Sequence, residues 1–268
     1  MAAPHLTLRG VRKVFGGLGR TGPVDALGPV DLEIARGEFF AIVGPSGCGK
    51  STLLEVIAGL ATTSDGTVAF EGKPIAGNVP DGVGVVFQED ASLPWLDVAS
   101  NIAFGLRRAA MPASERDARV RRALEMMSLV DFAASYPAQL SGGMRQRVCI
   151  ARTLVTEPRL ILLDEPFGAL DQHTRLLMGD ELLRLWRATG ATVFLITHAL
   201  DEAAMLADRI GVMSSRPGRF LDLVATGWPR ERDSRIVEQA SFGAVTARLW
   251  KTLREESMKT MGRTVAAP

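Results

Sequence analysis

A glycine-rich loop between an apolar strand and a helix constrains this chain more than any other feature. The apolar run 39–43 precedes the loop, and the helix-compatible segment 53–58 follows it. Glycines let a backbone curl and turn its N–H groups toward one point, and the next helix directs its positive N-terminal end at that point. The pattern predicts a phosphate-binding P-loop rather than a simple glycine-rich turn. The loop residues are Gly44, Pro45, Ser46, Gly47, Cys48, Gly49, Lys50, Ser51 and Thr52.

Charged and hydroxyl side chains that suit phosphate chemistry occur in this loop and after a second buried strand. Lys50 is predicted to reach the β- and γ-phosphates of a nucleotide, and Ser51 to hold Mg²⁺. The apolar run 160–163 ends in Asp164 and Glu165. Adjacent carboxylates at the carboxyl end of a parallel-type strand suit Mg²⁺ binding and polarisation of water. The sequence therefore predicts phosphoryl chemistry at this edge of the sheet.

Four other candidates each have an ordinary structural alternative. Gln88 follows a predicted strand, where a polar residue often lines a site. Ser141 begins a predicted helix and is either a plain N-cap or part of a second phosphate site. His198 follows another buried strand, a place where a lone histidine is more often structural. Phe15 stands beside glycines and either stacks on a base or packs at the core edge.

Composition narrows the class of protein. The chain has 268 residues, of which 47% are apolar, so it can bury a substantial core. A formal net charge of +1 gives no electrostatic case for nucleic acid as a partner. Two cysteines, one of them inside the phosphate loop, predict reduced thiols rather than a disulfide framework. Because no apolar run approaches the length of a membrane span, we expect membrane association only through a partner.

The remaining pattern alternates strands and helices, with helices gathered in the middle and at the end. Ser114 and Asp117 are spaced like a capping box, and the basic cluster Arg116, Arg119, Arg121 and Arg122 is either a solvated face or a partner contact. An apolar stripe on a helix is expected from Ile236, Val237, Ala240, Val245, Leu249 and Leu253. Strands are predicted at 6–8, 30–34, 67–70, 83–87, 192–196, 210–213 and 220–224, and helices at 101–108, 114–127 and 171–189.

The order of these motifs over roughly residues 5 to 226 resembles the nucleotide-binding subunit of an ABC transporter. The match consists of Gly44–Thr52 as Walker A, Gln88 as the Q-loop glutamine, Leu140–Arg147 as the signature, Leu160–Glu165 as Walker B, Gly168–Asp171 as the D-loop and His198 as the switch histidine. The resemblance implies an α/β P-loop NTPase fold: a RecA-like core with an antiparallel β-subdomain and an inserted helical subdomain. It places this domain at 5–229, its helical subdomain at about 93–139, and a C-terminal helical extension at 230–268.

The resemblance also implies roles for the candidate residues. ATP and Mg²⁺ are the expected cofactors, with Mg²⁺ held by Ser51, Gln88 and Asp164. Glu165 falls on the catalytic glutamate, His198 would contact the γ-phosphate, and Gln88 is counted with them as catalytic. Phe15 falls on the adenine-stacking position. Two copies are expected to pair head to tail, so that Ser141, Gly142 and Gly143 of one copy cover the ATP held by the other, with Asp171 bridging the dimer.

A narrower resemblance is to importers of nitrate, aliphatic sulfonates and taurine, and to related importers of pyrimidine precursors. Val86–Trp95, Asn101–Leu106, Asp201–Ala203 and Arg216–Arg219 carry it. It implies permease subunits as partners, indirectly a substrate-binding protein, and a peripheral place on the cytoplasmic face of the membrane. Trp95 is either an anchor for the permease or a packing residue of the helical subdomain. The rival reading is a soluble ABC ATPase acting on nucleic acid or ribosomes, but the single Walker A motif disfavours it.

Overall fold

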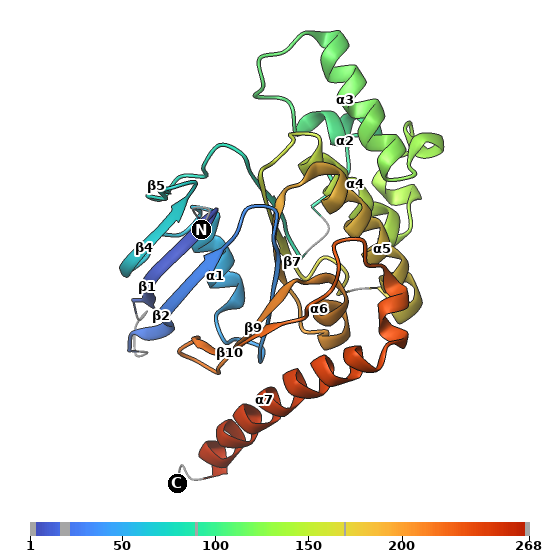
Figure 1. The fold of residues 1–268 in the computed structure, drawn as a ribbon. Coiled ribbons are helices and arrows are strands. Elements are labelled where there is room, and N and C mark those ends of the chain that lie inside the picture. The colour runs from blue at the N-terminus through green and yellow to red at the C-terminus, as the bar shows by residue number, and fades with distance from the viewer. Residues whose placement is uncertain (1–3, 17–21, 89–90, 169, 266–268) are drawn as a thin grey trace.

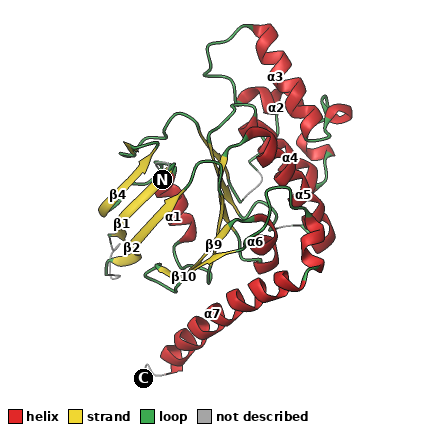
Figure 2. Cartoon of the chain, viewed as in Figure 1, coloured by secondary structure: helices red, strands yellow, loops and turns green. Residues whose placement is uncertain are grey.

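The computed structural model describes residues 4–16, 22–88, 91–168 and 170–265. Two sheets flank helix α1, and the other helices lie on the far side of the larger sheet or beyond it (Figure 1). Figure 2 colours the helices and the strands differently in the same view.

The strands are β1 Leu6–Phe15, β2 Val24–Ile34, β3 Phe39–Val43, β4 Asp65–Phe70, β5 Lys73–Pro74, β6 Val83–Val86, β7 Leu160–Asp164, β8 Thr192–Ile196, β9 Arg209–Met213 and β10 Phe220–Ala225. The helices are α1 Lys50–Ile57, α2 Val98–Phe104, α3 Ala113–Met126, α4 Gly142–Leu154, α5 Gln172–Thr189, α6 Leu200–Leu206 and α7 Ala240–Val265, with 3₁₀ turns η1 Val130–Phe132, η2 Pro137–Gln139 and η3 Ser234–Glu238.

The larger sheet has the strand order β10-β9-β3-β8-β7-β6. Strands β9, β3, β8, β7 and β6 are parallel to their neighbours, and β10 pairs antiparallel at one edge. Phe39 and Ala41 of β3 pack in the core on one face of the sheet, and Phe40 and Ile42 pack in the core on the other. A strand buried on both faces reads as a continuous apolar run, which explains why these strands were predictable. The predicted α/β P-loop fold is confirmed.

The smaller, antiparallel sheet has the order β2-β1-β4-β5, and its first two strands are longer than predicted. Strands were expected only at 6–8 and 30–34, but the pairing runs from Leu6 opposite Ile34 to Phe15 opposite Val24. Irregularities in the register interrupt this ladder. Gly28 and Pro29 of β2 lie at one of them, between the pairs Val11–Val30 and Lys13–Leu27, because a β-bulge tolerates residues that a regular strand does not.

The helices of the predicted helical subdomain begin at different residues from those expected. Asp97 caps α2 by accepting a hydrogen bond from the Ser100 N–H at 2.7 Å. Asn101, predicted as the first residue of that helix, is fully buried inside it and donates to the carbonyls of Leu93 and Leu96 at 3.1 and 2.8 Å. The predicted capping box at Ser114 and Asp117 is wrong: Pro112 is the N-cap of α3, which places Ser114 inside the helix.

The chain after Pro229 packs onto the larger sheet's helical face. Ile236, Phe242 and Leu249 are buried in its core cluster, and Val237, Val245 and Leu253 pack against them. Ala240 is exposed, so its predicted place in the stripe is wrong; Phe242 is buried there instead, because α7 begins only at Ala240. No helix within the described residues is both long enough and apolar enough to span a bilayer.

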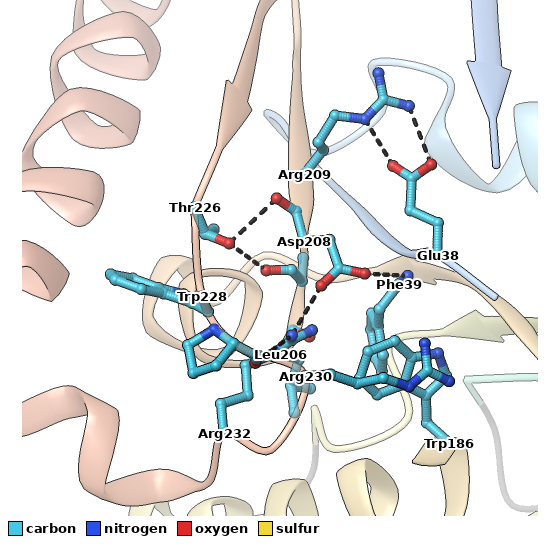
Figure 3. Close-up of polar contacts among 12 residues, drawn as sticks. Glu38, Phe39, Trp186, Leu206, Asp208, Arg209, Thr226, Trp228, Arg230 and Arg232 are labelled. Atoms are coloured by element: carbon cyan, nitrogen blue, oxygen red, sulfur yellow. Dashed lines mark hydrogen bonds and ion pairs between the residues drawn. The ribbon is translucent and has the colours of Figure 1, made fainter. Parts of the chain in front are cut away.

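A buried arginine ties this last segment to the sheet (Figure 3). The side chain of Arg232 is fully buried and donates to Asp208 Oδ1 at 2.8 Å. The other oxygen of Asp208 accepts the N–H of Phe39 at 2.8 Å, and the guanidinium lies 4.8 Å from the ring centroid of Trp186. Burial lowers the pKa of Arg232, and Asp208 opposes that effect. The chain after Pro229 is thereby bound to β3 and α5.

Replacing Arg232 should lower the urea concentration at which the protein unfolds. Arg232→Ala removes one partner of a buried ion pair, and we expect the free energy of unfolding to fall by about 3–5 kcal/mol. Arg235→Ala is the matched control, because the side chain of Arg235 is 84% exposed in its pair with Asp233, and an exposed ion pair contributes little to stability. Urea denaturation of both variants measures the difference. Equal losses would contradict the structural role of Arg232.

Candidate functional site

A cavity of about 600 Å³ opens where the carboxyl ends of several parallel strands meet. The P-loop follows β3, Gln88 follows β6, Glu165 follows β7 and His198 follows β8. Because these four strands are neighbours in the sheet, their ends bring together side chains from distant parts of the sequence. The lining residues are Phe15, Val24, Ala26, Ser46, Gly47, Gly49, Lys50, Ser51, Thr52, Gln88, Glu165, His198 and Arg216.

Two glycines of the loop have backbone conformations that other residues rarely adopt. Gly47 has a φ of 73° and Gly49 a φ of 106°. A Cβ on Gly49 would lie 2.6 Å from the carbonyl oxygen of Ala26, so the loop can approach β2 only with glycine there. The Lys50 ammonium lies inside the curl, donating to the carbonyls of Gly44 and Pro45 at 2.8 and 3.0 Å. The loop therefore has the compact form that a phosphate cradle needs.

Three predicted loop residues do not line the cavity: Gly44, Pro45 and Cys48. Cys48 is 1% exposed, and its side chain packs in the core between the two sheets. Burial raises the pKa of this thiol. A Cβ on Gly44 would lie 3.0 Å from Cys48 Sγ and 3.1 Å from Met213. Gly44 and Cys48 thus pack against the core beneath the loop. Their backbone N–H groups are the only groups through which they could contact a phosphate.

Glu165 lies at the centre of the polar side of the cavity. Its Oε2 accepts from the Gln88 amide nitrogen at 3.2 Å and lies 3.0 Å from His198 Nδ1. A carboxylate oxygen can only accept a hydrogen bond, so the Nδ1 of His198 carries the proton in this arrangement. Three residues predicted separately from sequence therefore form one connected group. His198 is an exposed member of this group rather than a structural histidine of the core.

Asp164 lies deeper than Glu165 and is 8% exposed. Burial raises the pKa of its carboxyl group, and a hydrogen bond with Ser51 opposes that effect. Within the described chain, its buried Oδ1 has no hydrogen-bond partner. Among the same residues, no three His, Cys, Asp or Glu side chains gather closely enough to hold a metal ion alone. Mg²⁺ commonly uses one or two carboxylates together with substrate phosphates and waters, so Asp164 and Ser51 fit it.

The signature residues Ser141, Gly142 and Gly143, and Asp171, lie outside this cavity. Ser141 caps α4, accepting from the Met144 N–H at 3.3 Å, and is exposed. Asp171 caps α5 by accepting from the N–H and hydroxyl of Thr174 at 3.0 and 2.6 Å. These hydrogen bonds lower the pKa of Asp171. Ala169 of the predicted D-loop lies outside the described residues, as do Glu89 and Asp90 after Gln88.

Phe15 also lines the cavity and is 41% exposed. Its ring has Lys13 Nζ at 5.0 Å from the centroid. Its exposure is compatible with contact to a bound base, and the stacking role stays a prediction.

Sequence reasoning missed two groups at this site. Arg216, named from sequence only within a segment that carries the importer resemblance, lines the cavity. Glu202 is buried, which raises the pKa of its carboxyl group to about 7, and it accepts from the Thr197 hydroxyl at 2.6 Å. Thr197 Oγ1 in turn accepts the Ala199 N–H at 3.0 Å, so this pair shapes the turn that carries His198. The sequence shows how far Glu202 lies from Thr197, but no pattern in it indicates that Glu202 is buried.

Comparison with known protein families identifies the family to which the chain belongs. The model of the ABC transporter family matches residues 27–168, more than half of the chain. The chain belongs to the ABC transporter family. An uncharacterized ABC transporter ATP-binding protein of Methanocaldococcus jannaschii is 42% identical, covering 89% of this chain and 88% of its own length.

Two of the similar ABC proteins are named for the solute that they import. The aliphatic sulfonates import ATP-binding protein SsuB 1 of Xanthomonas axonopodis pv. citri is 45% identical, over 82% of this chain and 88% of that protein. The taurine import ATP-binding protein TauB of Burkholderia pseudomallei is 47% identical, over 75% of this chain and 77% of that protein.

Solved ABC structures share the fold. A dimeric ATP-binding cassette in a post-hydrolysis state with ADP and Pi superposes with a TM-score of 0.71 at 33% identity, over 82% of this chain and 98% of that one. The structure of cbiO1 from Clostridium perfringens, part of the ABC transporter complex cbiONQ, has a TM-score of 0.75 at 26% identity, over 93% and 97%. Family and fold together make this chain an ABC ATPase.

Proposed function

We propose that the chain is the ATP-hydrolysing subunit of a membrane importer for taurine, aliphatic sulfonates, nitrate or a related small solute. Relatives named for taurine and aliphatic sulfonate import, at 47% and 45% identity, support this substrate class. The subunit works as a head-to-tail homodimer on the cytoplasmic face of the membrane, bound to permease subunits that receive solute from a substrate-binding protein. The observation that carries the dimer is the absence of Ser141, Gly142 and Gly143 from the lining of the chain's own cavity.

The candidate residues in and beside the cavity have distinct roles in the proposed hydrolysis of ATP. Phe15 stacks on adenine, the P-loop N–H groups bind the phosphates, and Lys50 neutralises charge on the β- and γ-phosphates. Glu165 orients a water molecule and takes its proton, while Gln88 and His198 hold the carboxylate of Glu165 in place. Ser51, Gln88 and Asp164 would hold Mg²⁺, which when bound neutralises phosphate charge.

The signature loop completes the site from the partner subunit. Ser141 presents the exposed N-terminal end of α4, a helix of 13 residues, and such an end favours an anion. The solved cassette with ADP and Pi is itself described as dimeric. It resembles this chain over 82% of the length of this chain. A head-to-tail pair would bring Ser141 of one subunit to the γ-phosphate bound by Lys50 of the other.

Mixing two inactive variants tests this arrangement. Ser141→Arg places a bulky cation where the helix end must close on the partner's phosphate, and Lys50→Ala disables the P-loop. Each variant alone should lose turnover, whereas a mixed dimer keeps one site with neither change and should recover up to about a quarter to a half of wild-type activity. Turnover is measured across mixing ratios, and native mass spectrometry confirms the mixed dimers. Confirmed mixed dimers with no recovered activity would overturn the composite site.

Trp95 marks the surface proposed to contact the permease. It is 70% exposed, so the alternative that it packs inside the helical subdomain is wrong. It precedes α2, whose Ala99 and Ala103 line a groove of about 530 Å³ together with Val120 and Leu124 of α3. Tryptophan is enriched among the residues that contribute most to protein interfaces. A short amphipathic segment of the permease suits this surface.

Trp95→Ala should therefore weaken coupling without weakening the fold. Because the side chain is exposed, the free energy of unfolding should change by no more than about 0.5 kcal/mol. Affinity for the membrane permease subunits, and solute-stimulated ATPase activity, should fall at least about tenfold, as for an interface hot spot. Trp250→Ala is the matched control, because Trp250 is 61% exposed on α7. Equal effects of the two changes on affinity would contradict the proposed surface.

A further inference from the structure

The turn between β9 and β10 contributes a cation to the nucleotide cavity. Arg216 lines the cavity, and its Nε and Nη2 both donate to the carbonyl oxygen of Gly47, at 3.1 and 2.9 Å. Within the described residues, Arg216 forms no ion pair with a carboxylate. A guanidinium has five N–H donors, so two bonds to Gly47 leave others for a second acceptor. The positive charge stands beside the loop that is proposed to hold phosphates.

Close backbone contacts fix where along the cavity this cation lies. The Gly218 N–H donates to the carbonyl of Ala26, and the carbonyl of Gly218 accepts from the Gly28 N–H, both at 3.0 Å. A Cβ on Gly218 would lie 2.2 Å from the carbonyl oxygen of Cys48, so no other residue allows this approach. The turn is thus wedged between β2, which lines the base end of the cavity with Ala26, and the P-loop at its phosphate end.

The C-terminal helix holds the same turn from the other side. Glu256 of α7 accepts from both the N–H and the hydroxyl of Ser215 through its Oε1, at 3.0 and 2.6 Å. Earlier in the helix, Arg248 pairs with Asp222 of β10 at 2.8 Å. These two contacts join helix α7 to the hairpin, and the contact of Glu256 is to the residue immediately before Arg216.

We propose that Arg216 binds the α-phosphate of the nucleotide and that Glu256 of α7 is the positioning residue that holds it there. The α-phosphate is the anionic group between the base and the β-phosphate, and the turn lies between the corresponding ends of the cavity. Any change in how α7 is anchored then alters nucleotide affinity, and nucleotide binding in turn stabilises α7, because linkage is reciprocal. This inference rests on the proposed nucleotide site.

Calorimetric titration of the full chain with ATP and with ADP tests the contact of Arg216. Both nucleotides carry an α-phosphate, so Arg216→Ala should raise the Kd for each by the same factor, about ten- to a hundredfold, the size expected when a hydrogen bond to a charged group is lost. Arg219→Ala, a charge change in the same turn, is the control and should leave both constants near wild type. Unchanged affinity in Arg216→Ala overturns the proposal, and a loss confined to ATP overturns the assignment to the α-phosphate.

The positioning role is tested by two changes at Glu256. Glu256→Ala removes the acceptor and should raise the Kd for ATP about two- to fivefold with kcat unchanged, whereas Glu256→Gln retains an acceptor and should restore wild-type affinity. Hydrogen exchange should show α7 protected by ATP in the wild type and less so in Glu256→Ala. Ser215→Ala removes one of the two donors and gives a milder change should Glu256→Ala fold poorly. Wild-type affinity in both alanine variants overturns the role of α7.

One further variant separates failure of this inference from failure of the nucleotide site. If Lys50→Ala binds ATP as tightly as wild type, the nucleotide is held elsewhere and both proposals fall. If Lys50→Ala loses ATP while the Arg216 and Glu256 variants do not, the nucleotide site stands and only the roles of Arg216 and α7 are refuted.

Discussion

Glu165→Gln should bind ATP normally and hydrolyse it about 10²–10⁴-fold more slowly, the range expected when a general base is lost. The amide keeps the size of the carboxylate and can still accept from Gln88 and His198, but it cannot take a proton from water. ATP should therefore persist in the site, and the dimer that closes around it should accumulate.

Size-exclusion chromatography with ATP and Mg²⁺, beside a turnover assay, measures both effects. Glu181→Gln is a suitable control, since Glu181 is an ion-paired residue on α5 that does not line the cavity. Rapid turnover with only monomer in the presence of ATP would assign the proton transfer to a different residue.

Lys50→Ala should reduce turnover about 10²–10³-fold, as expected when one preorganised charge at a phosphate is removed. The ammonium also bonds the carbonyls of Gly44 and Pro45, so the variant loses contacts within the loop. The body of the fold does not depend on them, because the flanking strand β3 is buried in two core clusters. The melting temperature should fall by only a few degrees.

Lys73→Ala provides the comparison, since Lys73 is an exposed lysine on β5 away from the cavity. A thermal melt, an ATP titration and a turnover assay on both variants separate loss of charge in the loop from general destabilisation. Near-normal turnover in Lys50→Ala would remove the P-loop from the proposed site.

Features that depend on neighbouring residues could be predicted from the sequence. The P-loop, the carboxylates after β7 and the continuous apolar strands were predictable because each combines a short motif with the strand that carries it. His198 and Gln88 were weaker predictions, since a single polar residue after a strand has several uses. Their convergence on Glu165 depends on the strand order, which only the ordered set of motifs implied.

Features that depend on packing between distant segments could not be predicted. Arg216 enters the cavity because Gly218 lets its turn approach the P-loop, and nothing near Arg216 in the sequence indicates that approach. Arg232 is buried against Asp208 and Trp186, and no motif around it in the sequence indicates that burial. Helix starts were also misplaced, because Asp97 and Pro112 compete with other capping residues nearby.

Because Cys48 is buried beneath the phosphate loop, the rate at which its thiol is alkylated reports how often the loop opens. With 1% of the residue exposed and its pKa raised by burial, it should be almost inert to alkylating reagents while the loop is closed. Labelling then proceeds only through transient opening, at a rate set by how often the loop leaves its place. Iodoacetamide and a mass spectrometer would thus time the opening of this loop in an unmodified protein, without a fluorescent probe or an engineered cysteine.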